Sequence, residues 1–146
     1  MTSDSGDRGR DFPELPPGPH KAILDTFNVD NPFFPGYLGI RVVDVRRGYA
    51  RLEVENRQPL SNPAGVMHGG ASFGLADTAV AVALISIYGP GNALLTIEMK
   101  INYLSRSSPG RSPPKRSCCA PAGAAPTPRS TCGRAASSQH APAPLT

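Results

Sequence analysis

An apolar run of 18 residues, Ala71–Tyr88, constrains the fold of this chain more than any other segment. Asp77 is its single charge, and Gly89-Pro90-Gly91-Asn92 follows it. A run of this length fits a helix, and the Gly/Pro cluster ends that helix. Because Asp77 and several small polar residues interrupt the run, we expect the buried helix of a soluble domain, with no membrane span and no membrane partner.

Three segments around this helix have the alternation that is typical of strands. Leu38–Val45 and Ala50–Glu55 flank a short turn at Arg46-Arg47-Gly48, and Thr96–Leu104 alternates apolar with polar side chains. A period of two indicates one buried face, and a short link with glycine favours a β-hairpin. The order hairpin, long apolar helix, strand predicts an α+β fold with an antiparallel sheet wrapped on one central helix.

The two ends of the chain lack this patterning. Residues 1–30 are rich in Gly, Pro and charge, and apart from a short helix over Ala22–Phe27 we expect them to be largely disordered. The next six residues, Asn31–Gly36, predict an irregular segment with aromatic side chains to bury. Residues 105–146 contain no Val, Ile, Phe or Tyr and one Leu, so we expect a disordered Pro/Ser/Arg/Ala-rich tail.

Charge and cysteine distribution exclude several classes of function. Residues 1–104 carry a net charge of −2 and residues 105–146 a net charge of +6, so the basic balance belongs to the tail. The tail has no aromatic side chain, and we expect no nucleic-acid partner. The three cysteines also lie there, with Cys118 and Cys119 adjacent, which indicates neither a disulfide framework nor a metal site. The polar N-terminal segment lacks a secretory pattern, and we expect a cytoplasmic protein.

Residues able to do chemistry gather around the start of the long helix. Asn62 lies in the preceding turn, His68-Gly69-Gly70 at the helix start, and Asp77 two turns inside. Free amides at a helix start can hold a developing oxyanion, and glycine allows a ligand close to the backbone. Taken alone, His-Gly-Gly also fits a flexible helix start, and Asp77 also fits a solvated carboxylate at a helix edge.

Spacing adds a constraint on how these residues could act together. Gly69 and Asp77 are eight residues apart, which is roughly 12 Å along a helix axis. One chain therefore cannot bring both to the same reacting carbonyl. If both act on one substrate, a second copy must supply its own Asp77, and a homodimer with shared sites follows. We expect Thr96–Leu104 to pair with its twin across the two-fold axis.

The strongest resemblance to a known family lies in the motif Asn62-Pro-Ala-Gly-Val-Met-His-Gly-Gly-Ala-Ser-Phe-Gly-Leu-Ala-Asp-Thr78. It resembles the signature of the hotdog-fold acyl-CoA thioesterases of the PaaI-like, phenylacetate-pathway group. Asn31-Pro-Phe, Leu38-Gly-Ile and Ile97–Tyr103 are similar to the same family, so the resemblance covers about residues 31–104. It implies a hotdog domain that hydrolyses a thioester to a carboxylic acid and free coenzyme A.

The resemblance also implies roles for the motif residues. Asp77 attacks the thioester carbon or activates water toward it, Gly69 offers its N–H to the carbonyl oxygen, and Gly70 contacts substrate. The site lies between two subunits of a homodimer or homotetramer. No metal and no retained cofactor are implied, because coenzyme A enters as part of the substrate. The residues that position water and the thioester are Asn62, His68 and, at the start of the following strand, Thr96.

The chain departs from the family after Tyr103, where members continue with further strands. The composition of residues 105–146 offers none, so the C-terminal strands are expected to be missing or replaced. A shifted reading frame would permit strand-like residues over Ser112–Cys119 and Thr127–Cys132. We therefore hypothesise an out-of-frame translation, which the absence of an intact adjacent frame in the gene would exclude. An inactive truncated remnant that cannot assemble the dimer site, and another hotdog chemistry such as enoyl-CoA hydration, are the alternatives.

Overall fold

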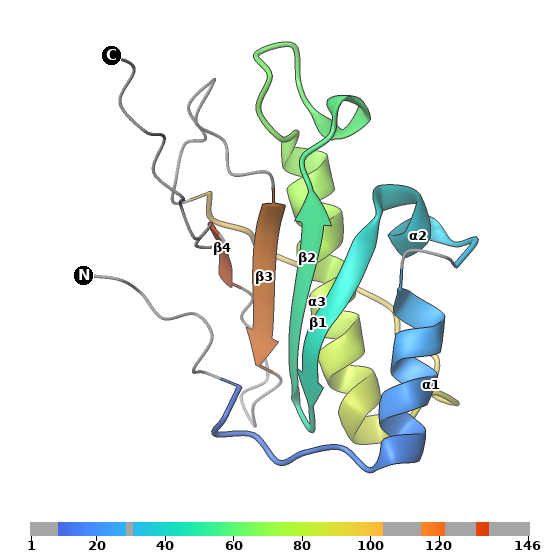
Figure 1. The fold of residues 1–146 in the computed structure, drawn as a ribbon. Coiled ribbons are helices and arrows are strands. Elements are labelled where there is room, and N and C mark those ends of the chain that lie inside the picture. Colours follow the sequence, from blue (N-terminus) through green and yellow to red (C-terminus); the bar gives the residue numbers. More distant parts are fainter. Residues whose placement is uncertain (1–8, 29–30, 104–114, 122–130, 135–146) are drawn as a thin grey trace, which may run out of the picture.

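One antiparallel sheet and one long helix make up most of the architecture. The structure, a computed structural model, describes residues 9–28, 31–103, 115–121 and 131–134. Its strands lie in the order β1-β2-β3-β4, and helix α3 lies behind the sheet while α1 lies beside them (Figure 1). The predicted α+β plan of a sheet wrapped on one long helix is confirmed. In chain order the elements are α1 (Pro17–Phe27), α2 (Phe34–Leu38), β1 (Ile40–Arg46), β2 (Tyr49–Glu55), a 3-10 turn η1 (Gln58–Leu60), α3 (Gly69–Tyr88), β3 (Lys115–Pro121) and β4 (Thr131–Arg134).

Helix α3 is the element that the apolar run predicts. It begins at Gly69 after the N-cap residue His68 and ends at Tyr88, where Gly89 takes a φ of 88° that favours glycine. The helix is long and apolar enough to cross a membrane, but 56% of its apolar window is buried inside the structure. Its buried side chains pack on the sheet, mainly on β2 and β3.

The predicted hairpin is formed by β1 and β2. The two strands pair antiparallel from Ile40 opposite Val54 to Arg46 opposite Tyr49, with an irregularity between Val42 and Asp44. Two residues, Arg47 and Gly48, connect them, one fewer than the sequence suggests, and Gly48 has a φ of 83°. The apolar side chains of this hairpin form the core together with those of α3.

A buried hydroxyl connects the β1–β2 hairpin turn to the C-terminal end of α3 by hydrogen bonds. The Gly48 N–H donates to Ser86 Oγ at 2.7 Å, and Ser86 Oγ donates to the Ala83 carbonyl at 2.6 Å. Gly48 and Ser86 are both buried. Because water cannot replace these contacts, the turn and the helix depend on each other for their polar groups.

The segment after α3 differs from its prediction. Thr96–Leu104 is expected as a strand, but in the described part, up to Tyr103, it forms none. It returns along α3 instead, with Met99 and Ile101 packed on the core and Ile97 99% exposed. An alternating pattern indicates which side chains can be buried, but it does not indicate whether a neighbouring strand is available to pair with the backbone. Here β2 pairs with β1 and β3, and the segment packs on the helix.

The tail also differs from its prediction at two places. The sequence predicts a disordered segment over residues 105–146, but 115–121 and 131–134 form β3 and β4. Strand β3 pairs with β2 from Glu55 opposite Lys115 to Tyr49 opposite Pro121, and Ala120 is fully buried. Strand pairing uses backbone groups that almost every residue type carries, which is why a poor apolar composition does not reveal it. The rest of the tail prediction lies outside the described residues.

The N-terminal region is more ordered than its composition indicates. Helix α1 begins at Pro17, five residues before the expected start at Ala22, and proline suits the first helical position. Before it, the Phe12 ring stacks on Tyr49 with centroids 5.2 Å apart, and the Arg47 N–H donates to the Pro13 carbonyl at 2.9 Å. The prediction of disorder is therefore wrong for residues 9–21, whereas the short helix expected over Ala22–Phe27 is present as the second half of α1. Residues 1–8 lie outside the described residues.

Helix α2 replaces the second half of the irregular segment expected over Asn31–Gly36, and residues 31–33 are irregular as expected. The aromatic side chains there are not buried as predicted, because Phe33 is 67% exposed and Phe34 is 58% exposed. The five-residue helix places Leu38 in the core and Phe34 against Gly74 of α3. Gly39, with a φ of 73°, ends it and leads directly into β1.

We expect Ser86→Ala to lower the free energy of unfolding. The change removes the acceptor of the buried Gly48 amide, and an unpaired buried N–H costs about 1–3 kcal/mol. Thr26→Ala is the matched control, because the Thr26 hydroxyl is exposed and donates to the carbonyl four residues earlier. Urea denaturation measures both variants. An unfolding free energy for Ser86→Ala equal to that of the unaltered chain would contradict this role.

Candidate functional site

The first turn of α3 leaves one backbone amide available. The Gly70 N–H donates to His68 Nδ1 at 2.9 Å, and the Ala71 and Ser72 N–H groups donate to the His68 carbonyl. Within the described residues, Gly69 is the position in this turn whose N–H has no hydrogen bond. The structure thus leaves free the amide expected to bind a carbonyl oxygen, whereas the amide of Gly70 is engaged by the cap.

Two turns further along α3, Asp77 is held by a residue from the returning segment, which is residues 92–103 after the end of α3. Thr96 Oγ1 donates to Asp77 Oδ1 at 2.6 Å, across 19 positions of sequence. The Asp77 side chain is half-buried, and Phe73, one turn earlier, is partly exposed. The hydrogen bond occupies one carboxylate oxygen and fixes the orientation of the group. Two of the predicted site residues therefore meet, although the strand expected to begin at Thr96 is not formed.

Asn62 orders the turn that delivers His68 to the helix start. Its side-chain Oδ1 accepts the N–H groups of Ala64 at 3.0 Å and Val66 at 3.3 Å. Its own N–H donates to the Val66 carbonyl at 2.8 Å, and the His68 N–H donates to the Leu60 carbonyl at 2.8 Å. These contacts hold a compact turn over residues 60–68, and they use the acceptor side of the Asn62 amide.

The predicted residues fall into two groups on one helix. His68, Gly69 and Gly70 lie at its start, with Asn62 in the turn before them, and Asp77 lies with Thr96 further along. Because α3 is a continuous α-helix over this distance, Gly69 and Asp77 are separated by roughly 12 Å along its axis. Within one chain the structure does not bring them to a common point.

Tyr103 joins this site, a role that the sequence does not predict. Its hydroxyl donates to the Gly69 carbonyl at 2.9 Å. A Cβ atom on Gly69 would lie 3.2 Å from that hydroxyl oxygen, so the tyrosine approaches the glycine closely. The only sign of this role in the sequence is that Tyr103 carries a hydroxyl at the end of an otherwise apolar face of residues 97–103. The alternating pattern predicts instead that this side chain is buried in a strand.

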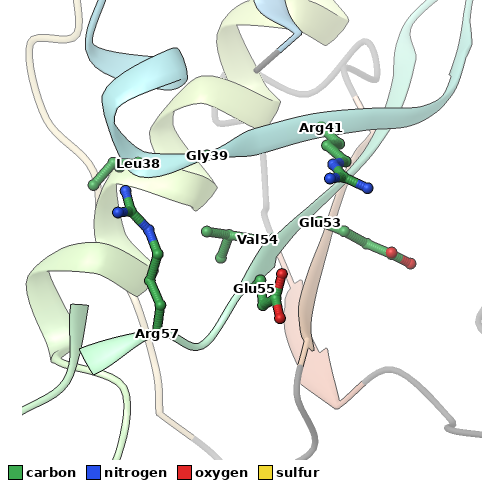
Figure 2. Close-up of a pocket in the computed structure, with 7 residues that line it drawn as sticks. All are labelled: Leu38, Gly39, Arg41, Glu53, Val54, Glu55 and Arg57. Atoms are coloured by element: carbon green, nitrogen blue, oxygen red, sulfur yellow. The ribbon is translucent and has the colours of Figure 1, made fainter. Parts of the chain in front are cut away.

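A cavity of about 120 Å³ lies elsewhere, between the end of α2 and the strands β1 and β2. Figure 2 shows charged side chains of both signs around it, and the Arg57 guanidinium donates to the Tyr37 carbonyl. No predicted site residue lines this cavity. Its lining residues are Leu38, Gly39, Arg41, Glu53, Val54, Glu55 and Arg57.

Comparisons with known proteins agree with this architecture. The sequence matches the family described as "Domain of unknown function (DUF4442)" over residues 20–110. A putative esterase of Archaeoglobus fulgidus is 37% identical over 73 residues, which is 50% of this chain and 46% of the relative. A 1,4-dihydroxy-2-naphthoyl-CoA hydrolase of Listeria monocytogenes is 29% identical over 73 residues, which is 50% of this chain and 59% of that protein. The chain thus spans about half the length of these curated relatives.

Solved structures show the same fold. The conserved protein PA5202 of Pseudomonas aeruginosa is 30% identical with a TM-score of 0.56, covering 64% of this chain and 71% of that one. A mutant of the phenylacetic acid degradation protein PaaI of Thermus thermophilus is 25% identical with a TM-score of 0.55, covering 69% of this chain and 85% of that one. The hotdog fold implied by the motif is confirmed. Because the match to the DUF4442 model extends over more than half of the sequence, the chain belongs to the DUF4442 family, and it shares its hotdog fold with PA5202 and PaaI.

Proposed function

We propose that this chain is an acyl-CoA thioesterase that releases a carboxylic acid and free coenzyme A at a site shared between two copies. The observation that carries the proposal is the pair of groups on α3, the Gly69 N–H, which has no hydrogen bond among the described residues, and the Asp77 carboxylate held by Thr96. An amide donor and an oriented carboxylate are the two groups that thioester hydrolysis needs. The relative named as a putative esterase and the relative named as a CoA hydrolase support the same reaction class.

The chemistry follows from the position of each group. The Gly69 N–H donates to the substrate carbonyl oxygen and stabilises the negative charge that develops there. Asp77 of the other copy takes a proton from water as the water oxygen bonds to the carbonyl carbon. The carbon–sulfur bond then breaks, and the proton passes to the leaving thiolate. Thr96 keeps Asp77 Oδ1 occupied, so that Oδ2 is the oxygen available for the proton.

A second copy is required because of the helix geometry. The two groups lie roughly 12 Å apart on one rigid element, whereas a reacting carbonyl must lie within hydrogen-bond reach of both. A two-fold arrangement solves this, because each helix start then faces the Asp77 of the partner and two equal sites form. We propose a homodimer as the active unit, in which neither metal nor retained cofactor takes part.

The alternative is a remnant that keeps the motif without assembling the shared site. The observation in its favour is the segment after α3, where Leu95 is 90% and Ile97 is 99% exposed and no strand is present through residue 103. A segment in this state offers no ordered edge to a second copy. A monomeric or aggregated species without thiol release would support the remnant, whereas a dimer with turnover would exclude it.

We expect Asp77→Asn to reduce thiol release by about a hundredfold or more, because the amide cannot take a proton from water. The substituted amide can still accept the Thr96 hydroxyl through its oxygen, so the fold should persist. The assay measures free thiol from a short panel of aliphatic and aryl acyl-CoAs. Glu98→Gln is the matched control, since Glu98 is an exposed acid on the returning segment. Equal losses in both variants, or none in Asp77→Asn, would contradict the assignment.

The Gly69 amide is tested by comparing two substitutions at one position. Gly69→Pro removes the N–H at the first helical position, where proline is tolerated, and the extended backbone of His68 (ψ 140°) suits a following proline. Gly69→Ala adds a Cβ in the same place but keeps the N–H. We expect the proline variant to lose about a hundredfold more kcat than the alanine variant. Equal kcat values would show that this amide does not hold the oxyanion.

Mixing the two inactive variants tests whether the site is shared. A heterodimer of Asp77→Asn with Gly69→Pro contains one site with both groups intact, because each copy supplies what the other lacks. Random re-association of equal amounts should restore about a quarter of the unaltered activity, as expected for a two-fold dimer. Each variant mixed with itself is the control. Absence of any restoration in a mixture shown to contain heterodimer would contradict a shared site.

A further inference from the structure

The peptide unit that joins Gly69 to Gly70 is held at both of its ends. Its carbonyl oxygen accepts the Tyr103 hydroxyl at 2.9 Å, and its N–H donates to His68 Nδ1 at 2.9 Å. One partner comes from the residue before the helix and the other from the segment that returns along it. The plane of this peptide is therefore set by two side chains, in addition to the helix that begins there.

Such double anchoring matters because two successive glycines begin the helix. Glycine has the largest conformational freedom of any residue, so a diglycine start is poorly defined by its own backbone. Holding the Gly69–Gly70 plane restricts the ψ angle of Gly69 and, through the shared Cα atom, the direction of the neighbouring Gly69 N–H. A donor that is oriented before the reaction stabilises a developing charge without reorganisation.

Burial does not explain the position of Tyr103. The side chain is 59% exposed, although its hydroxyl oxygen would lie 3.2 Å and its Cζ 3.5 Å from a Cβ on Gly69. The end of its ring is thus placed by the hydrogen bond and by the missing side chain at residue 69. A phenylalanine would fill the same exposed space and lose only the contact with the Gly69 carbonyl.

We propose that Tyr103 is a positioning residue that, together with His68, orients the Gly69 amide toward the substrate carbonyl. This inference rests on the proposed thioesterase function and adds a residue to its site. Tyr103 acts through the Gly69 backbone and does not itself contact the reacting atoms. The returning segment then serves both groups of the site, with Thr96 on Asp77 and Tyr103 on Gly69.

Tyr103→Phe tests the proposal by removing one hydroxyl. We expect kcat for thiol release to fall by about tenfold with KM unchanged, since the lost orientation affects the transition state more than substrate binding. Tyr88→Phe is the matched control, because Tyr88 is 61% exposed at the end of the same helix and should keep the original kcat. A rise in KM with kcat retained, or equal kcat values in Tyr103→Phe and the unaltered protein, would overturn the proposal.

A double variant distinguishes positioning from a general structural effect. In the Gly69→Pro background the amide to be oriented is gone, so Tyr103→Phe should cause no further loss of kcat. A tenfold loss that persists in this background would overturn the proposal, because Tyr103 would then act by another route.

Amide NMR separates this inference from the thioesterase assignment. In Tyr103→Phe we expect the Gly69 and Gly70 amide resonances to shift and the Gly70 amide to exchange faster with solvent, whether or not the protein turns over. Turnover missing from the unaltered protein would refute the proposed function, and the glycine resonances would still report on the Tyr103 contact. Unchanged glycine amides in Tyr103→Phe would overturn the inference, even in an active enzyme.

Discussion

The packing of one side of α3 against the sheet is the interaction on which the rest of the structure depends. The helix buries small and branched side chains along its length. At its C-terminal end Ser86 accepts a hydrogen bond from the hairpin turn, and its N-terminal end follows the turn at Asn62. A rigid helix sets the distance between the groups it carries. That distance is what separates Gly69 from Asp77 and makes a second copy part of the proposed chemistry.

Flexibility and order are balanced at the start of this helix. Glycines at positions 69 and 70 let a substrate approach the backbone, but they also leave that backbone poorly defined. Two contacts restrict this backbone: the N-cap residue His68 accepts the Gly70 N–H, and the Tyr103 hydroxyl donates to the Gly69 carbonyl. The pair of contacts leaves the Gly69 N–H as the unengaged donor of the first turn within the described residues, which is the arrangement an oxyanion requires.

The segment that follows α3 connects the two halves of the site. Its polar contacts, Thr96 with Asp77 and Tyr103 with Gly69, follow the reverse order of their partners on α3, as expected for a segment that runs antiparallel to the helix. Its apolar side chains are divided, with Met99 and Ile101 against the core and Ile97 in solvent. This division explains why the alternating pattern is a poor guide here. Met99 and Ile101 satisfy the pattern by packing on the core and Tyr103 contacts Gly69, whereas the exposed Ile97 is not packed on the core in the described part of a single chain.

The sequence by itself determined the parts that depend on local periodicity and turn chemistry. These are the central helix with its glycine stop, the β1–β2 hairpin and the motif from Asn62 to Asp77, because apolar spacing and glycine positions act over a few residues. It also placed Thr96 in the candidate site through the family resemblance. Only the tertiary structure decided the contacts between distant segments, which are the pairing of 115–121 with β2, the path of 92–103 along α3, and the Tyr103 contact with Gly69. Backbone pairing is open to nearly any residue type, and a hydroxyl 34 positions away leaves no periodic trace in the sequence.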